Sequence, residues 1–228
     1  MSQAPKYGQA FALWRCASNK SWRAYTRHEF VNSLCDGTLP KAAFIQYLVQ
    51  DYIFLVHFSR AWALAIVKSA NLEEMKICAE TVNALIHHEM QLHVETCADA
   101  GISEGNLLNA QEAPENLAYT RYVLEAGYTG DFLDLLAALA PCVLGYGEIG
   151  VQSKARQTSN EYDGWIATYS DPEYQQTCVD VGQLIDKALI LRLGEDYTKI
   201  PRWSGLCKTF ETATQLEAKF WDMGLRTE

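Results

Sequence analysis

The sequence predicts an all-α fold that forms a single domain over residues 1–228. Apolar residues recur at spacings of three and four almost throughout the chain, as they do in helices with one buried face. Runs of alternating apolar and polar residues bounded by hairpin turns are missing, so strands are not expected. There is no internal repeat or long linker, and a chain of this length can bury roughly 70% of its unfolded surface. We therefore expect a helical bundle that can enclose a deep pocket.

Caps and breakers mark the helices of the first half of the chain. The helices expected here cover residues 8–17, 21–34, 38–70 and 72–100. Asp36-Gly37 fits a left-handed cap that ends the second helix, and Pro40 suits the first turn of the third. Asn71 can cap the fourth helix, and Gly101 ends it.

The second half follows the same signals. The helices expected here cover residues 116–126, 131–156, 161–169, 172–194 and 206–225. A looser segment rich in Asn and Glu, residues 102–115, precedes them. Gly127 is expected to end the first of these helices, and Asp131 to cap the second. A turn containing Pro201 leads into the last helix.

Composition excludes several classes of partner. The formal net charge is -9, and Lys and Arg are not clustered, which argues against binding to nucleic acid or to an anionic membrane surface. No secretory signal and no apolar span of membrane length is found, so a cytoplasmic location is expected. The seven cysteines are scattered without a Cys-x-x-Cys pair, so neither a disulfide framework nor a thiolate zinc site is predicted.

The stretch 137–150 holds a cysteine on the inward face of a helix. Leu139, Cys142, Tyr146 and Ile149 recur at helical spacing, which places the thiol in the core. Pro141 is expected to kink the helix or to restart it just before Cys142. The positive end of a restarted helix would favour the thiolate, so Cys142 is a candidate nucleophile. The alternative is a cysteine that acts as a small buried hydrophobe.

Two acids stand where the helical period requires apolar residues. Asp51 lies on one stripe with Leu48 and Leu55, and Glu217 occupies an inward position of the last helix. An unpaired buried carboxylate costs several kcal/mol or more, so each needs a partner, a proton or a function. Asp51 could be bonded to a tyrosine or a helix end, and Glu217 could pair with Lys219 or lie at an exposed edge.

Aromatic residues are abundant enough to wall a stacking pocket, although aromatic residues at helical spacing also form plain core. The candidates are Tyr47, Tyr52, Phe54, Tyr119, Tyr146, Tyr169 and Phe220.

A metal site is the competing interpretation of the fourth helix. Glu89 and His93 are four residues apart and share a helix face, next to His87 and His88. Bundles with two metal ions require a second Glu-x-x-His pair, and no second copy is found. A solvated helix surface that carries histidines is the alternative, and we expect no metal and no other cofactor.

Four motifs resemble the TenA family, the thiaminase II or aminopyrimidine aminohydrolases, in the order and at the separations typical of that family. They are Gln50-Asp51-Tyr52, the run from Ala140-Pro141-Cys142 to Gly150, Tyr162-x-x-Trp165-Ile166-x-x-Tyr169, and Leu216-Glu217-Ala218-Lys219-Phe220-Trp221-Asp222-Met223. The resemblance covers nearly the whole chain. It implies a haem-oxygenase-like helical bundle with a central pocket, assembled as a homo-oligomer, a tetramer or a dimer.

The implied reaction belongs to thiamin salvage. It releases 4-amino-5-hydroxymethyl-2-methylpyrimidine from 4-amino-5-aminomethyl-2-methylpyrimidine or from thiamin, and the sequence leaves open which of these, or the formyl derivative, is preferred. By resemblance, Cys142 is the nucleophile, Glu217 exchanges a proton with the ring, and Asp51 holds the amidine-like edge of the pyrimidine. The positions of the aromatic wall are Tyr119, Tyr146, Tyr169 and Phe220.

One position departs from the family pattern. Phe54 stands three residues after the aspartate, where a tyrosine is expected, so it keeps the aromatic face of the pocket without the hydroxyl. A raised pKa is expected for Glu217 in its apolar setting, so that it could carry a proton near neutral pH. The alternatives are a metal-dependent oxygenase of the same bundle and a non-catalytic pyrimidine-binding protein.

Overall fold

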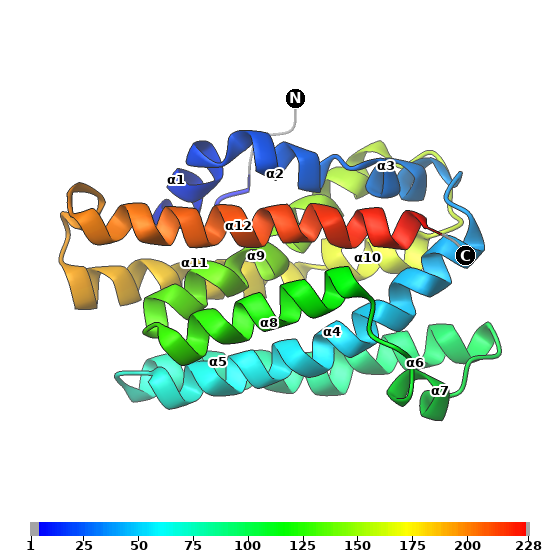
Figure 1. Ribbon diagram of the computed structural model, residues 1–228. Helices are drawn as coiled ribbons and strands as arrows, with labels where there is room; N and C mark the ends of the chain where they lie inside the picture. The colour runs from blue at the N-terminus through cyan, green and yellow to red at the C-terminus, as the bar shows by residue number, and fades with distance from the viewer. Residues whose placement is uncertain (1–4, 227–228) are drawn as a thin grey trace.

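The computed structural model describes residues 5–226, and within them the chain is helical without a strand (Figure 1). The all-α prediction is confirmed. The elements are α1 (Gln9–Ala17), α2 (Asn19–Thr26), α3 (Glu29–Asp36), α4 (Lys41–Lys68), α5 (Leu72–Ala84), the π-helical turn η1 (Leu85–Glu89), α6 (Met90–Asp99), α7 (Glu104–Leu108), α8 (Pro114–Thr129), α9 (Phe132–Arg156), α10 (Asp163–Ser170), α11 (Pro172–Leu193), the 3-10 turn η2 (Tyr197–Lys199) and α12 (Pro201–Leu225).

Helix α9 runs through the middle of the bundle, behind α8 and α12 in Figure 1. Every residue from Leu135 to Gly150 is buried. By length and hydropathy α9 could cross a membrane, but 94% of its most apolar window is buried against other helices of this chain. That burial is typical of the core helix of a bundle, which is apolar on all sides because other helices surround it.

Several predicted helix ends are confirmed together with their caps. Asn71 Oδ1 accepts a hydrogen bond from the Glu74 amide at 3.0 Å, and Asp131 Oδ1 accepts from the amides of Leu133 and Asp134. Gly37 has φ 78° and Gly101 has φ 82°, a conformation that is left-handed and favours glycine. Local sequence signals therefore determine these ends.

The helix predicted over residues 21–34 is wrong, because the chain breaks between α2 and α3. His28 is extended, with ψ 155°, and its Nδ1 accepts from the amide of Phe30 as the cap of α3. His28 Nε2 also lies 3.1 Å from Asp222 of α12. The break lets Tyr25 and Phe30, from two different helices, both stack on Trp221.

At the end of α8 and at the start of α12, helix packing and a proline override the predicted boundaries. Gly127 does not end α8, which continues to Thr129. A Cβ on Gly127 would lie 2.6 Å from Leu64 of α4, so this glycine permits close helix packing instead. Helix α12 begins at Pro201, which occupies its first position, and not at residue 206.

The helix expected over residues 72–100 contains the π-helical turn η1 at Leu85–Glu89. A π turn inserts one extra residue, and each residue of an α-helix rotates the side chains by about 100°. The buried positions upstream are Glu74, Cys78 and Thr81, and those downstream are His93 and Cys97. The extra residue therefore turns His93 toward α4.

Candidate active site

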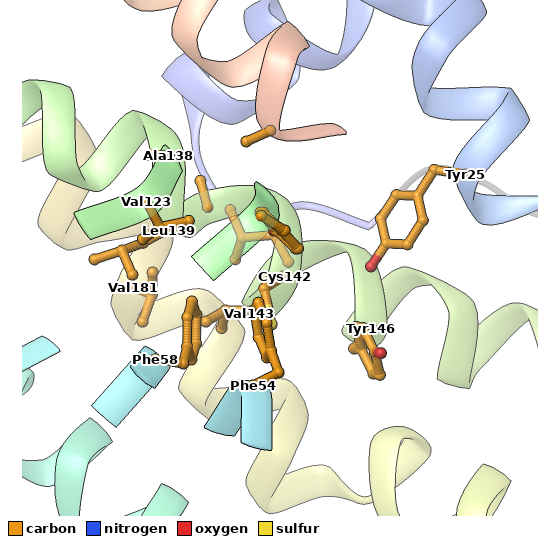
Figure 2. Packing of buried hydrophobic residues seen from close by; sticks show 14 of the residues in the cluster. Tyr25, Phe54, Phe58, Val123, Ala138, Leu139, Cys142, Val143, Tyr146 and Val181 are labelled. Carbon is orange, nitrogen blue, oxygen red and sulfur yellow. The ribbon is translucent and has the colours of Figure 1, made fainter. Parts of the chain in front are cut away.

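Cys142 lies at the centre of α9, in a buried cluster with Phe54 and Phe58 of α4 and Tyr146 of its own helix (Figure 2). Helix α9 continues through Pro141, so the predicted restart before Cys142 is wrong. The carbonyl of Pro141 accepts a hydrogen bond from Tyr25 Oη at 3.4 Å. The surrounding helices hold α9 together across the proline, and no new positive helix end forms at the sulfur.

The thiol of Cys142 rests in its protonated form. Burial, followed by the charges of Glu217, Glu89 and Asp51, raises its pKa well above the ordinary value. The predicted shift toward thiolate is therefore wrong. A thiol of this kind can add to a substrate only if its proton moves to a nearby base during the reaction.

A second group is Glu217 of α12, which receives a hydrogen bond from Tyr119 Oη of α8 at 2.8 Å. Burial raises the pKa of this carboxyl to about 8, with the charge of Asp51 adding to the shift and the Tyr119 hydrogen bond opposing it. The predicted raised pKa is confirmed, and its hydrogen-bond partner is Tyr119 instead of Lys219. Near neutral pH the group holds a proton that it can donate.

Gln50 of α4 binds the start of α8, the helix that carries Tyr119. Its side chain donates to the Gln111 carbonyl and accepts from the Ala113 amide, each at 2.9 Å. Asn116 Nδ2 in turn donates to the Gln50 carbonyl at 2.8 Å. These bonds attach the start of α8, the helix that carries Tyr119, to α4 one residue before Asp51.

Asp51 of α4 is held by two partners through a single oxygen. Tyr47 Oη donates to Oδ2 at 3.0 Å, and His93 Nε2 lies 2.7 Å from the same atom. His93 Nδ1 lies 2.8 Å from the Glu89 carbonyl, which can only accept, so Nδ1 carries a hydrogen. Burial lowers the pKa of His93, but the hydrogen bond and charge of Asp51 outweigh burial and raise it above its ordinary value. The raised pKa of His93 favours its protonated form beside Asp51.

His93 is the site residue that sequence reasoning missed in this role. The interpretation as a solvated helix surface is correct for His87 and His88, which are exposed, but not for His93, which is only 1% exposed. Both of its ring nitrogens are engaged, so neither has a lone pair free for a metal. Within residues 5–226, no group of three or more His, Cys, Asp or Glu side chains is placed to hold a metal ion.

Glu89 is a third acid, at the end of η1. Its Oε1 receives a hydrogen bond from Tyr169 Oη of α10 at 2.7 Å. Burial and the charge of Asp51 raise the pKa of Glu89 to about 7, and His93 and the Tyr169 hydrogen bond oppose this shift. Asp51, Glu89 and Glu217 therefore all act on the same thiol, from three different elements.

Aromatic rings close the space around these groups. Phe54 packs against Phe58, Tyr119 and Phe220, with ring centroids 4.9 to 5.6 Å apart. Tyr146 contacts Tyr169 and Trp165, and Trp165 Nε1 donates to Tyr47 Oη at 3.3 Å. Among the aromatic candidates Tyr52 makes none of these ring contacts, and burial, followed by the charge of Glu104 of α7, raises its pKa.

Cys142 keeps a small exposed fraction that several residues around it on α9 lack. Leu139, Ala140 and Leu144 are 0% exposed, whereas Cys142 is 8% exposed. A hollow of about 160 Å³ opens between α4, α6 and α10 and reaches His93 and Trp165. A larger surface groove of about 330 Å³ lies between α5 and α11 and touches none of these groups, so its size carries no weight for the site.

Comparison with known proteins gives consistent matches. The family model described as TENA/THI-4/PQQC matches residues 17–227. A protein of Halalkalibacterium halodurans named aminopyrimidine aminohydrolase is 32% identical over 205 residues, which covers 89% of each chain.

Solved structures agree with these matches. A structure described as a TenA family transcription regulator, from Silicibacter sp. TM1040, is 58% identical with a TM-score of 0.96, and covers 97% of this chain and 98% of its own. A domain with a haem-oxygenase-like fold from Shewanella denitrificans, 15% identical, superposes with a TM-score of 0.70 over 94% of this chain and 90% of its own. The latter likeness identifies the fold alone, and it confirms the expected haem-oxygenase-like bundle.

Proposed function

Because this chain belongs to the TENA/THI-4/PQQC family, we propose that it is a thiamin-salvage hydrolase. It would release 4-amino-5-hydroxymethyl-2-methylpyrimidine from 4-amino-5-aminomethyl-2-methylpyrimidine, and from thiamin as a second substrate. The observation that carries the proposal is the buried Cys142 thiol, set among Glu217 and the Asp51–His93 pair. The name of the Halalkalibacterium relative, aminopyrimidine aminohydrolase, supports the same activity.

Binding would begin at Asp51. Its Oδ2 is occupied by Tyr47 and His93, which leaves Oδ1 for a ligand. An aminopyrimidine presents an exocyclic N–H beside a ring nitrogen, and a carboxylate oxygen can accept from that N–H. Phe54, Tyr119, Tyr146, Tyr169 and Phe220 would form the aromatic wall of the binding site. His93 would hold the Asp51 carboxyl group in place through Oδ2.

Addition of the thiol would then use Glu217. Net addition of S–H across the ring C=N bond forms a bond between Cys142 Sγ and the ring carbon and places a hydrogen on the ring nitrogen. Protonated Glu217 gives its proton to that nitrogen and, as a carboxylate, receives the proton of the thiol. A carboxyl with a pKa of about 8 can perform both transfers near neutral pH.

The leaving group would depart from the exocyclic carbon after this addition. The 4-amino nitrogen supplies the electron pair that forms an exocyclic C=C bond as ammonia or the thiazole leaves. Water then adds to that carbon, and the thiol is released as the ring C=N bond re-forms. No metal or other cofactor enters these steps.

Two alternative functions fit the observations less well. An oxygenase that used Glu89 and His93 as metal ligands would have to break the bonds of His93 to Asp51 and to the Glu89 carbonyl. Control of transcription, the description of the Silicibacter protein, requires a basic surface if it acts through DNA, and this chain has a net charge of -9.

Assembly and location complete the proposal. We propose a homo-oligomer, as in the family that the sequence resembles. We also propose a cytoplasmic location, because all seven cysteines are free, which suits a reducing compartment.

The direct test supplies purified protein with 4-amino-5-aminomethyl-2-methylpyrimidine and with thiamin in parallel, and measures the hydroxymethylpyrimidine product. Turnover of either compound supports the proposal, and the ratio of the two rates identifies the preferred substrate. Tight binding of the pyrimidine without product from either compound would instead indicate a non-catalytic binding protein.

A further inference from the structure

Glu89 is the one acid around Cys142 that the proposed reaction leaves without a role. Its partner Tyr169, which donates to Glu89 Oε1 at 2.7 Å, packs on Tyr146 with ring centroids 4.8 Å apart, and Tyr146 lies one turn after Cys142 on α9. Glu89 therefore lies beside the site, and its charge also contributes to the raised pKa of Cys142. The π-helical turn that ends at Glu89 is a local distortion of a kind frequent at functional sites.

Glu89 is held through one oxygen and accessible through the other. Tyr169 Oη donates to Oε1, and among the residues that the structure describes Oε2 has neither a hydrogen-bond partner nor the full burial that would seal it. Asp51 and Glu217 show the same arrangement, because the protein wall also holds one oxygen of each. Each of the three carboxyl groups therefore keeps one oxygen that no protein group within residues 5–226 occupies.

The chemistry has a step for a third carboxyl group. Asp51 and Glu217 would serve the ring, but the primary amine must leave as ammonia, and the incoming water must lose a proton. Both events occur at the exocyclic carbon. A group that pairs with an ammonium and then accepts a proton is required there.

We propose that Glu89 is that group, a second acid–base residue of the site that acts on the exocyclic amine and on the water. This inference rests on the proposed function. The Glu89 carboxylate holds the amine as an ammonium, and the C–N bond breaks with its electron pair remaining on nitrogen, which leaves as ammonia. The water oxygen bonds to the exocyclic carbon, its proton goes to Glu89, and Glu89 passes that proton to ammonia.

The groups that shift the pKa of Glu89, besides burial, are Asp51 of α4, His93 of α6 and Tyr169 of α10. The charge of Glu89 in turn raises the pKa of Tyr47 of α4, Cys142 of α9 and Tyr174 of α11. Glu89 must be ionised to hold the ammonium, and its pKa is about 7. The rate should therefore fall as the pH drops below about 7.

The test compares two leaving groups in the variant Glu89→Gln. Glutamine keeps an oxygen that can accept from Tyr169, but it cannot pair with an ammonium or take a proton. Hydrolysis of the aminomethylpyrimidine should slow by about 10²-fold or more. The thiazole of thiamin leaves as a neutral ring and needs no proton. If Glu89 acts only on the amine and on the water, the rate of thiazole release in the first turnover should therefore stay within about threefold of wild type. Glu95→Gln, exposed on α6, is the matched control.

Each outcome decides the inference. Equal slowing with both substrates would assign Glu89 a purely structural role and overturn it, as would an unchanged rate with the amine. If wild type hydrolyses only the amine, the dependence of its rate on pH decides. Loss of the decrease in rate below about pH 7 in Glu89→Gln supports the inference, and its retention overturns it. A wild-type protein inactive on both compounds would overturn the proposed function itself.

Discussion

The raised pKa of Glu217 makes the stability of the protein depend on pH. This pKa is raised from 4.5 to about 8, so the folded protein binds a proton that the unfolded chain releases between those values. The free energy of unfolding must therefore fall as the pH rises through this window. One pKa unit corresponds to about 1.4 kcal/mol, so the loss is on the order of a few kcal/mol.

Replacing Glu217 with glutamine should remove most of this pH dependence. The glutamine side chain can still accept from Tyr119 but cannot ionise, so the variant should lose less unfolding free energy than wild type between pH 5 and pH 9. Urea unfolding at both pH values measures this, with exposed Glu95→Gln as the control. Because the pKa of Glu89 is also raised, the unfolding free energy of the variant should still decrease with pH, but less steeply than that of wild type. Equal slopes in wild type and Glu217→Gln would mean that the carboxyl does not hold a proton in the folded state.

Sequence reasoning could place the two acids because a regular helix repeats. Asp51 and Glu217 interrupt stripes of apolar residues, and the structure buries both, at 3% and 2% exposure. It could not place His93, because the π turn shifts the buried face by one residue. An unbroken α-helix would carry the stripe of Glu74, Cys78 and Thr81 to about residues 88, 92 and 96, and not to His93 and Cys97.

The Cys142 thiol shows a second property that the sequence alone could not predict, its protonation state. Its inward position follows from spacing, but its pKa depends on burial, on charges from four other elements and on whether α9 stays intact at Pro141. Proline alone favours a break, and the packing of α9 on its neighbours outweighs that local preference. Tertiary contacts of this kind cannot be obtained from one segment of sequence.

At the scale of elements, glycines set how closely α9 approaches its neighbours. A Cβ on Gly150 would lie 2.4 Å from the backbone carbon and oxygen of Tyr169 in α10. That distance is far below van der Waals contact, and backbone atoms cannot rotate away. Helix α10 carries Trp165 and Tyr169, so the glycine places two site residues as well as a helix.

The variant Gly150→Ala should therefore displace α10. We expect a loss of about 1 to 3 kcal/mol of unfolding free energy, typical of overpacking, together with a lower kcat/KM. Thermal unfolding and steady-state kinetics measure the two effects. The control is Gly164→Ala, where a Cβ meets nothing within 4 Å, so its stability should be unchanged or raised by up to about 1 kcal/mol. If both variants behave alike, the close approach of α9 and α10 is not a constraint.

At the scale of the whole molecule, the site joins most of the bundle. Its residues come from α4, η1, α6, α8, α9, α10 and α12, which are far apart in the sequence. A ligand that contacts these elements binds the folded chain and not the unfolded one. Such binding stabilises by about 2.7 kcal/mol at a hundred times Kd.

The hydroxymethylpyrimidine product should therefore raise Tm. For a chain of this size, about 2 to 4 °C per kcal/mol gives a shift of roughly 5 to 10 °C at a hundred times Kd. Differential scanning fluorimetry across a ligand titration measures it, and Asp51→Asn, which removes the carboxylate that would hold the ring, should reduce the shift. A Tm that stays constant at product concentrations that inhibit turnover would place the ligand outside this core.

The central claim is that Cys142 forms the bond to the ring. The most direct measurement compares hydrolysis of 4-amino-5-aminomethyl-2-methylpyrimidine by Cys142→Ala and by Cys78→Ala, a buried cysteine of α5 outside the site. Both variants remove a buried thiol, so they share any general effect on packing. The account predicts a loss of about 10³-fold or more in kcat for Cys142→Ala and near wild-type kcat for Cys78→Ala. A folded Cys142→Ala protein that keeps kcat within a few fold of wild type would contradict it.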